Sequence, residues 1–376
     1  MAKDFSPSPP PLTPPLTEEE KLSWLRLLRS RRVGVRTFYR LMAEHGSAEA
    51  ALAALPEIAR AAGVSDYAVC TADAAEGEFA AGLRAGAQLV AAGETAYPPA
   101  FGDLDDAPPL LWVLGDPALF ARPMIALVGA RNASSLGLRM TRKLARELGE
   151  AGYVVVSGLA RGIDTAAHDG ALKTGTVAVV AGGVDVVYPA ENAALAQEIG
   201  DRGAIISDQP MHMTPTARHF PARNRLISGL AQAVVVVEAA AKSGSLITAR
   251  NALDQGRDVL AVPGHPFDAR AAGCNMLIRD GAALVRGARD ILTALKRPEP
   301  AQAPAPACED RPVRDLAATA KLHRMILDQL GPTPVAEDQL IRDLKATPAD
   351  VAPALVKLEL DGKIRRAAGG MVARMI

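Results

Sequence analysis

Cysteine is scarce in this sequence: the 376 residues include three, Cys70, Cys274 and Cys308, far apart and in no metal-ligand spacing. Their number and spacing exclude a disulfide scaffold, argue against a zinc site and fit a reducing compartment. The chain also lacks any run of about 18 uncharged apolar residues, the length that a membrane-spanning helix requires. No apolar stretch follows basic residues at the N-terminus, so we expect no signal peptide and a cytoplasmic protein.

Net charge and aromatic side chains are also low. The 42 basic residues are balanced by 42 acidic ones, and aromatic residues make up 4% of the chain. Bulk charge therefore does not predict a polyanionic partner, and any nucleic-acid site has to be a local cluster of arginine and lysine. The hydrophobic content of 49% is sufficient for sizeable cores in two or three domains.

Changes in composition divide the chain into five segments. Prolines crowd the N-terminus, which we expect to be an unpaired, polyproline-like tail, and they recur with alanine and glutamine in a later linker. After the tail, Thr17 and Glu20 form a capping-box pattern, and Ala-rich helices are predicted to about Ala92. The predicted boundaries are tail 1–16, helical domain 17–97, central domain 98–297, linker 298–314 and C-terminal domain 315–376.

The central domain contains short β-branched runs without clean alternation, separated by helical patterns. Buried strands that alternate with helices predict a mostly parallel sheet covered on both faces, which is a doubly wound α/β domain. The predicted strands are Met124–Val128, Tyr153–Val156, Thr176–Val180, Ala204–Ile206, Ala233–Val237 and Val259–Val262.

The C-terminal domain shows helical patterns at 322–330, 335–344 and 347–358, followed by a hairpin pattern at 363–376. Three helices and a hairpin predict a winged helix. The expected recognition helix contains Pro353 and is acidic, so it is a poor reader of the DNA major groove. The acidic residues in and after this helix are Asp350, Glu359 and Asp361, and the basic residues of the hairpin are Lys363, Arg365, Arg366 and Arg374.

A loop of small residues, from Gly129 to Gly137, links the first predicted strand of the central domain to a helix. Free backbone N–H groups and the helix dipole favour phosphate at such a position, and Arg131 adds a guanidinium. The spacing is not G-x-G-x-x-G and no G-K-[ST] occurs, so neither dinucleotide nor P-loop binding is supported. An ordinary strand-to-helix turn is the alternative interpretation.

Two further strand ends carry the same kind of residue. A domain that binds NAD would place a carboxylate near the end of the second strand to hold the ribose, but a hydroxyl, glycines and a guanidinium stand there. Because the carboxyl ends of parallel strands meet at one edge of a sheet, the loops predict a single crevice for an anionic ligand. The residues are Ser157, Gly158, Arg161 and Gly162 after the second strand, and Lys242, Ser243 and Gly244 after the fifth.

A basic segment with one aromatic residue precedes the fifth strand. Phe220 and Asn224 lie there among Arg218, Arg223 and Arg225. Guanidinium groups bind phosphates and an aromatic ring stacks on a base, which is the combination that single-stranded nucleic acid requires. The alternative places Phe220 under the sheet and leaves the arginines solvated.

Two other patterns are interpreted as structural. Asp164 and His168 stand four residues apart on one helix face, but no third ligand with metal-site spacing accompanies them, so we expect a hydrogen bond that fixes the preceding loop. Tyr188 and Pro189 are expected to shape a turn. The sequence offers no nucleophile, carboxylate pair or metal-ligand set, so we predict no catalytic residue, no metal and no cofactor.

Taken together, these motifs resemble the DNA processing protein A (Smf) family over roughly Met124 to Val285, in the family's order. The resemblance implies a Rossmann-like core with an N-terminal domain like a sterile alpha motif and a C-terminal winged helix. It implies a non-enzymatic protein of natural transformation that binds incoming single-stranded DNA, protects it, loads the RecA recombinase and forms a homodimer through the Rossmann-like domain. The expected DNA-binding residues are Gly129, Arg131, Ser157, Gly158, Arg161, Gly162, Phe220, Arg223, Asn224, Lys242, Ser243 and Gly244.

Two other functions remain open. A nucleotide phosphoribohydrolase resembling the lysine-decarboxylase-like group would share the core, but the glutamate that follows its G-G-x-G-T signature is missing after Ser243–Thr248, which leaves Glu238 as the candidate acid. A sequence-specific regulator would instead read duplex DNA through the winged helix.

Overall fold

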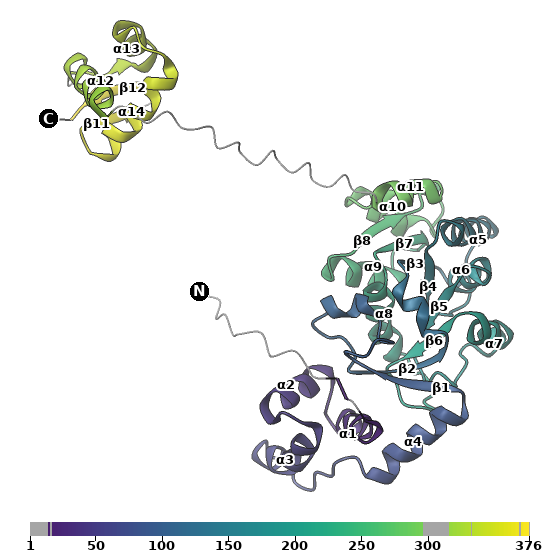
Figure 1. Cartoon of the computed structure of the whole chain (residues 1–376). Coiled ribbons are helices and arrows are strands. Elements are labelled where there is room, and N and C mark those ends of the chain that lie inside the picture. Colours follow the sequence, from purple (N-terminus) through teal and green to yellow (C-terminus); the bar gives the residue numbers. More distant parts are fainter. Residues whose placement is uncertain (1–13, 16, 296–315, 332, 368–369, 376) are drawn as a thin grey trace. The chain divides into compact units, whose positions relative to one another are not determined.

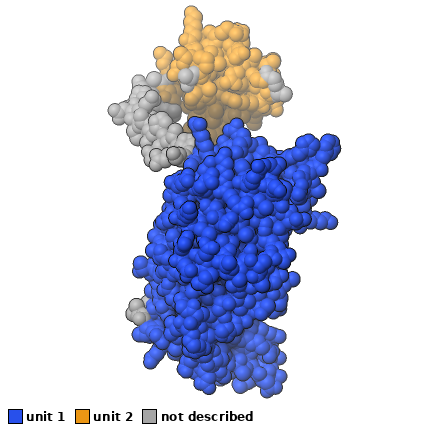
Figure 2. All heavy atoms as spheres, turned by 90° about the vertical axis from the view of Figure 1, so that its right-hand side faces the viewer, with its two compact units in different colours: residues 1–297 blue, residues 298–376 orange. Residues whose placement is uncertain are grey.

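The protein divides into two compact units, Met1–Arg297 and Pro298–Ile376 (Figure 2). The computed structural model describes residues 14–15, 17–295, 316–331, 333–367 and 370–375. The predicted linker and all of the predicted tail except Pro14 and Pro15 lie outside these residues. Within the described part of the chain, no helix has the length and apolar character needed to cross a membrane.

The first unit begins with helices that pack around Trp24, Phe38 and other buried apolar residues. The predicted capping box at Thr17 is confirmed: its hydroxyl accepts a hydrogen bond from the Glu20 N–H at 3.2 Å, and the Glu20 carboxylate accepts one from the Thr17 N–H at 3.1 Å. These contacts satisfy N–H groups that an uncapped helix start leaves unpaired. The helices are α1 (Glu18–Arg29), α2 (Val35–His45), α3 (Ala48–Ala61) and α4 (Ala72–Arg84).

The prediction of helices to about Ala92 is wrong for its last residues. Gly86, at φ +76°, follows α4, and β1 (Ala87–Ala91) then pairs antiparallel with β2 (Leu110–Gly115). Alanine favours helix locally, but this segment buries Leu89 and Val90 against a strand about 20 residues further along the chain. Tertiary pairing therefore overrides local propensity here.

The central sheet has the order β1-β2-β6-β5-β4-β3-β7-β8-β9 (Figure 1). In this order, all neighbouring strands from β6 through β3 to β9 pair parallel, whereas β2 pairs antiparallel with β6. All six predicted strands are present, so the predicted doubly wound, mostly parallel domain is confirmed. They are β3 (Met124–Gly129), β4 (Val154–Ser157), β5 (Thr176–Val179), β6 (Ala204–Ser207), β7 (Ala233–Glu238) and β8 (Asp258–Ala261), and a short β9 (Ala283–Leu284) follows.

Helices cover both faces of this sheet because successive strand residues point to opposite sides. In β3, Ile125 and Leu127 pack with residues of α5, α6 and α11, whereas Ala126 and Val128 pack with residues of α8, α9 and α10. The helices are α5 (Ser135–Glu150), α6 (Ile163–Ala171), α7 (Ala193–Arg202), α8 (His219–Leu230), α9 (Ser245–Asp254), α10 (Ala272–Arg279) and α11 (Ala288–Leu295).

Strand order changes direction at β3. This strand has β4 on one side and β7 on the other, so the connections from β3 run one way and the later connections run the other way. In open α/β sheets this arrangement opens a crevice beyond the carboxyl ends of the strands on either side of the reversal. The loops after β3, β4 and β7 are therefore placed to share one site.

The second unit is the predicted winged helix. Ile326, Leu340, Leu355 and Val372 lie in its buried core. Residues 335–336 form a strand and not the start of the second helix, because Val335 and Ala336 pair with Val372 and Met371. Its elements are α12 (Leu316–Gln329), β10 (Val335–Ala336), α13 (Glu337–Leu344), α14 (Pro348–Leu360), β11 (Ile364–Ala367) and β12 (Met371–Arg374).

A part-buried ion pair joins the N-terminal helices to the sheet. Arg29 of α1 donates two hydrogen bonds of 2.9 Å to Glu78 of α4, and the Trp112 indole of β2 donates a third, also 2.9 Å, to the same carboxylate. The side chains of Arg29 and Glu78 are 16% and 11% exposed. We expect Glu78→Ala to lower the free energy of unfolding by about 3–5 kcal/mol, because it leaves a guanidinium and an indole N–H without their acceptor.

Urea denaturation followed by tryptophan fluorescence measures this loss. Glu44→Ala is the control, since Glu44 pairs with Arg40 at 3.7 Å between exposed side chains and should contribute at most about 0.5 kcal/mol. Equal losses in the two variants would show that the contact to Glu78 adds nothing to stability.

Candidate nucleic-acid interface

Two cavities of about 580 and 380 Å³ lie at the carboxyl ends of β3, β4 and β7. Arg131, Asn132, Ala160 and Phe220 line both of them, so the cavities adjoin and together form what we call the crevice. The structure thus brings together the three loops and the start of α8 that the sequence predicts to share a site.

The side chains of Arg131 and Phe220 are in contact at the centre of the crevice. The guanidinium carbon of Arg131 lies 5.0 Å from the centroid of the Phe220 ring, within cation–π distance. Arg131 is exposed and forms no ion pair with any other described residue. Phe220 is half-buried, so the alternative that places it under the sheet is wrong.

Tyr188 is a residue that sequence reasoning assigned to turn formation only. Its ring lies 5.6 Å from the Phe220 ring at an interplanar angle of 51°, and it is 49% exposed. It lines the smaller cavity together with Arg161. One usable signal for Tyr188 was its residue type, because an aromatic residue in the loop after a strand is unusual in a chain with 4% aromatic residues.

Three N–H groups of the first loop are already paired within the protein. A carboxylate from β7 is already present, since Glu238 accepts a hydrogen bond of 2.7 Å from the Ser134 N–H. The Glu238 carbonyl accepts another, of 2.6 Å, from the Ala130 N–H, and the Ser134 hydroxyl accepts from the Gly137 N–H at 3.0 Å. An internal anion therefore occupies the position at the start of α5 that the sequence suggested for a ligand.

Three N–H groups of the second loop are paired in the same way, and here the predicted structural role of Asp164 and His168 is confirmed. The Asp164 carboxylate accepts from the N–H groups of Gly158 (3.1 Å) and Ala160 (3.4 Å), and His168 Nε2 accepts from the Leu159 N–H at 3.3 Å. Burial raises the pKa of Asp164, with Arg223 acting in the opposite direction.

The tautomer of His168 follows from its contacts. The Thr176 hydroxyl donates to the Val155 carbonyl at 2.8 Å, so it accepts from His168 Nδ1, which lies 2.8 Å away. His168 therefore carries its proton on Nδ1 and leaves Nε2 free to accept from the loop. Burial lowers its pKa to about 3, which keeps the ring neutral at ordinary pH.

Arg223 and Ser157 lie beneath the crevice surface. The Arg223 guanidinium is 5% exposed and donates hydrogen bonds to the carbonyls of Gly158, at 2.7 Å, and Val179. Burial lowers its pKa to about 10, and Asp164 counteracts this shift. The Ser157 hydroxyl is fully buried and donates to the Leu127 carbonyl at 2.7 Å. Both side chains hold strand ends together.

Two glycines are required by close packing between loops. A Cβ on Gly158 would lie 2.7 Å from the Arg223 guanidinium. Gly162 has φ +77°, and a Cβ there would lie 2.6 Å from the Arg131 carbonyl oxygen. The sequence suggested that these glycines let a phosphate approach the backbone. In the structure they instead let other parts of the chain approach it.

The remaining expected residues are at the surface or near it. Lys242 is exposed, and Gly244 has no neighbour within 4 Å of an added Cβ. The Ser243 hydroxyl bonds to that of Ser245 at 2.8 Å, and the Asn224 amide donates to the Gly244 carbonyl at 3.4 Å. These contacts join α8 to the start of α9. Gly129 lies where the β3–β7 register shifts.

Three other arginines near the crevice have carboxylate partners. Arg161 pairs with Glu191 at 2.6 Å on the surface, and Arg270, which the sequence analysis missed, lines the larger cavity and bonds to Asp268 at 3.0 Å. Arg225 lies outside the crevice lining and pairs with Asp208 at 2.9 Å. No group of acidic, histidine or cysteine side chains suited to a metal occurs among the described residues.

Comparison with known proteins gives three matching family models. The one described as DNA recombination-mediator protein A matches residues 88–296. Models of a DprA-like N-terminal HHH domain and a DprA winged helix domain match residues 18–81 and 296–370. DNA processing protein DprA of Streptococcus pneumoniae is 44% identical over 198 residues, 52% of this chain and 70% of that protein, and its Bacillus subtilis counterpart is 42% identical over 202 residues, 53% and 68%.

Two solved structures are similar over most of their own length. The X-ray structure of the Streptococcus pneumoniae protein has a TM-score of 0.57 and 33% identity, covering 74% of this chain and 93% of that one. DNA processing protein A of Helicobacter pylori, described for its single-stranded DNA binding mode, has a TM-score of 0.51 and 32% identity, covering 55% of this chain and 95% of that one.

The buried position of Arg223 predicts a large effect on stability. Arg223→Met leaves the carbonyls of Gly158 and Val179 unpaired and removes the cation beside Asp164, so we expect a loss of about 3–5 kcal/mol in the free energy of unfolding. Arg218→Met, at an exposed position just before the same helix, is the control. Urea denaturation measures both, and an unchanged midpoint for Arg223→Met would refute a structural role.

The lowered pKa of His168 predicts a pH dependence. Below about pH 6.5 the unfolded chain binds a proton at this residue and the native protein does not, so its contribution to stability falls as the pH decreases toward 3. Between pH 7.5 and pH 5 this amounts to about 2 kcal/mol. His168→Gln, which cannot titrate, should lose that much less over the interval, whereas His265→Gln at an exposed position should behave like the parent protein.

Proposed function

Because this chain belongs to the DNA recombination-mediator protein A family, we propose that it binds single-stranded DNA in the crevice. We further propose that it acts in the cytoplasm without catalysing a reaction, protects incoming DNA and loads the RecA recombinase onto it during natural transformation. The single-stranded DNA binding described for the Helicobacter pylori relative supports the choice of ligand. The choice of site is supported by the hydrogen bonds that hold the loops lining the crevice at the ends of the strands.

The unpaired guanidinium of Arg131 over the Phe220 ring is the observation that carries the proposal. A phosphate at Arg131 would place a neighbouring base within reach of Phe220 and Tyr188. Lys242, which also lines the larger cavity, provides a second exposed cation. Cations for the backbone and rings for the bases bind single strands without reading their sequence.

The other expected residues contribute to binding by holding the loops. Ser157, Gly158, Gly162 and Arg223 fix the loop after β4, and Asn224 with Ser243 and Gly244 joins α8 to the loop before α9. Preorganised loops bind without an ordering cost at the moment of contact. We also propose a homodimer through this domain, where α9 and β9 expose Leu253 and Leu284.

The two alternative functions have less support in the described contacts. Glu238, the candidate acid of a phosphoribohydrolase, is buried and accepts a hydrogen bond from the loop after β3. In the winged helix, acidic side chains pair with the basic residues Lys363 and Arg366, at 3.8 Å and 3.6 Å, and so reduce the charge available to a duplex.

Replacing the two central side chains should separate charge from stacking. We expect Arg131→Ala to weaken oligonucleotide binding and to reduce the slope of log K against log salt by about 0.7, the value for one phosphate contact on a single strand. Phe220→Ala should cost about 1–3 kcal/mol and leave the salt slope unchanged. Fluorescence anisotropy with labelled oligothymidylate at several salt concentrations measures both quantities.

Arg84→Ala is the control, since Arg84 is exposed and lines neither cavity. Competition with unlabelled single strand, duplex and mononucleotide completes the test. The proposal fails if binding ignores ionic strength and survives the combined Arg131 and Phe220 replacement, or if mononucleotide competes as well as the oligonucleotide and releases free base.

A further inference from the structure

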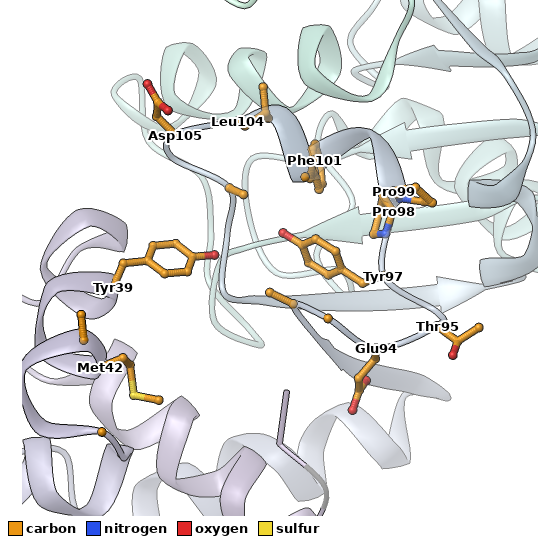
Figure 3. A pocket seen from close by; sticks show the side chains of 16 residues that line it. Tyr39, Met42, Glu94, Thr95, Tyr97, Pro98, Pro99, Phe101, Leu104 and Asp105 are labelled. Atoms are coloured by element: carbon orange, nitrogen blue, oxygen red, sulfur yellow. The ribbon is translucent and has the colours of Figure 1, made fainter. Parts of the chain in front are cut away.

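A cavity of about 930 Å³ in the first unit is separate from the crevice. It lies between α2 and the segment that follows β1 (Figure 3). Tyr39 and Met42 line it from α2, and Tyr97, Pro98 and Phe101 line it from the other side. Its size is at the upper end of the range for binding pockets. The proposed DNA-binding function makes no use of it.

One hydrogen-bond donor is available on this aromatic wall. The hydroxyl groups of Tyr39 and Tyr97 point toward one another across the cavity (Figure 3). Tyr97 is committed, because its hydroxyl donates to the Pro108 carbonyl at 2.6 Å. The Tyr39 hydroxyl has no hydrogen-bond partner among the described residues, and burial raises its pKa to about 12, so it remains a donor.

These properties suit a proline-rich peptide. A polyproline-II stretch presents proline rings and carbonyl acceptors but few N–H donors, and aromatic-lined grooves recognise it through ring packing and a few donors to those carbonyls. The cavity offers aromatic rings on both sides and the free Tyr39 hydroxyl between them. Its chemistry therefore matches the backbone and the side chains of such a peptide.

The first described residues of the chain, Pro14 and Pro15, lie at the rim of this cavity. Pro14 packs on Gly93, a lining residue, since a Cβ added to Gly93 would lie 3.0 Å from the Pro14 Cβ, and Pro15 is buried. Lys21 holds the start of α1 nearby through Glu94 at 2.6 Å and the Leu89 carbonyl at 3.2 Å. Any residue shortly before Pro14 is thus tethered next to the cavity.

We propose that this cavity binds the chain's own residues 5–13, Phe-Ser-Pro-Ser-Pro-Pro-Pro-Leu-Thr, as a polyproline-II segment. The segment has four prolines and no charged residue, which fits an apolar wall. At about 3.1 Å per residue it spans about 28 Å when extended in this form, enough to cross the cavity. The Pro-rich segment 298–314 is a poorer fit for an apolar wall, because it carries five charged residues, Glu299, Glu309, Asp310, Arg311 and Arg314.

A peptide-binding experiment tests this proposal. A fluorescent peptide of residues 3–13 is titrated with the chain lacking residues 2–13, which keeps every described residue, and with the full chain. We expect binding to the shortened chain and at least about tenfold weaker binding to the full chain, because a short tether gives the native segment an effective concentration on the order of millimolar. A peptide of residues 298–310 and one with serine in place of every proline are the control peptides.

Variants of the shortened chain locate the bound peptide. Tyr39→Phe removes only the free hydroxyl and should weaken binding severalfold, and Tyr39→Ala should abolish it. Tyr153→Ala, which removes another half-buried ring outside the cavity, should have no effect. Thermal unfolding of each variant identifies any that fail to fold, and Tyr39→Phe keeps the test valid if Tyr39→Ala is one of them.

Three results would overturn the proposal. The peptide could fail to bind the shortened chain, or it could bind the full and shortened chains equally, which would mean that the native segment does not occupy its site. Tighter binding of the 298–310 peptide than of the 3–13 peptide would assign the cavity to the other segment. Unchanged affinity in Tyr39→Phe and Tyr39→Ala chains that fold would place the peptide elsewhere.

Discussion

The buried guanidinium of Arg223 is the constraint on which the crevice depends. It extends from α8 to the carbonyl of Gly158, just after β4, and to that of Val179, the last residue of β5, and Asp164 partly neutralises it. A buried cation is stable only with such partners. The hydrogen bonds of Arg223 therefore fix the position of α8 relative to the ends of two strands. Phe220 lies one turn earlier on the same helix, and the contact therefore also determines where its ring lies.

The loops around this cation are closed by internal anions and acceptors. Glu238 accepts a hydrogen bond from the N–H at the start of α5. Asp164 and His168, both in α6, accept hydrogen bonds from N–H groups of the loop before that helix. These side chains accept from the backbone N–H groups of Ser134, Gly158, Leu159 and Ala160, which are therefore not available to a phosphate. In the proposed function, a single strand would be bound by exposed side chains such as Arg131 and Lys242, because the same sheet topology can serve different ligands.

Much of the fold could be predicted from sequence patterns, because buried parallel strands and their covering helices have distinct periodicities. The convergence of the three loops could also be predicted, since it follows from the parallel sheet alone. The pairing of the Ser134 N–H could not, because its acceptor, Glu238, reaches the first loop from β7. The pairing of the Gly158 carbonyl could not either, because its donor, Arg223, reaches the second loop from α8. The strand β1 was missed for a similar reason, as its partner β2 lies beyond a turn and decides its conformation.

Few unpaired cations line the crevice. In the proposed function, their number sets how much of the affinity for single-stranded DNA comes from charge and how much comes from stacking. Arg161 and Arg270 are held by Glu191 and Asp268, but these are pairs between largely exposed side chains. Exposed ion pairs contribute little to stability because solvent screens them, so a phosphate could displace the carboxylates and recruit both arginines at little cost. The rings of Phe220 and Tyr188 need no such exchange, so the proposed binding predicts that stacking on them provides the affinity that remains when salt screens the charges.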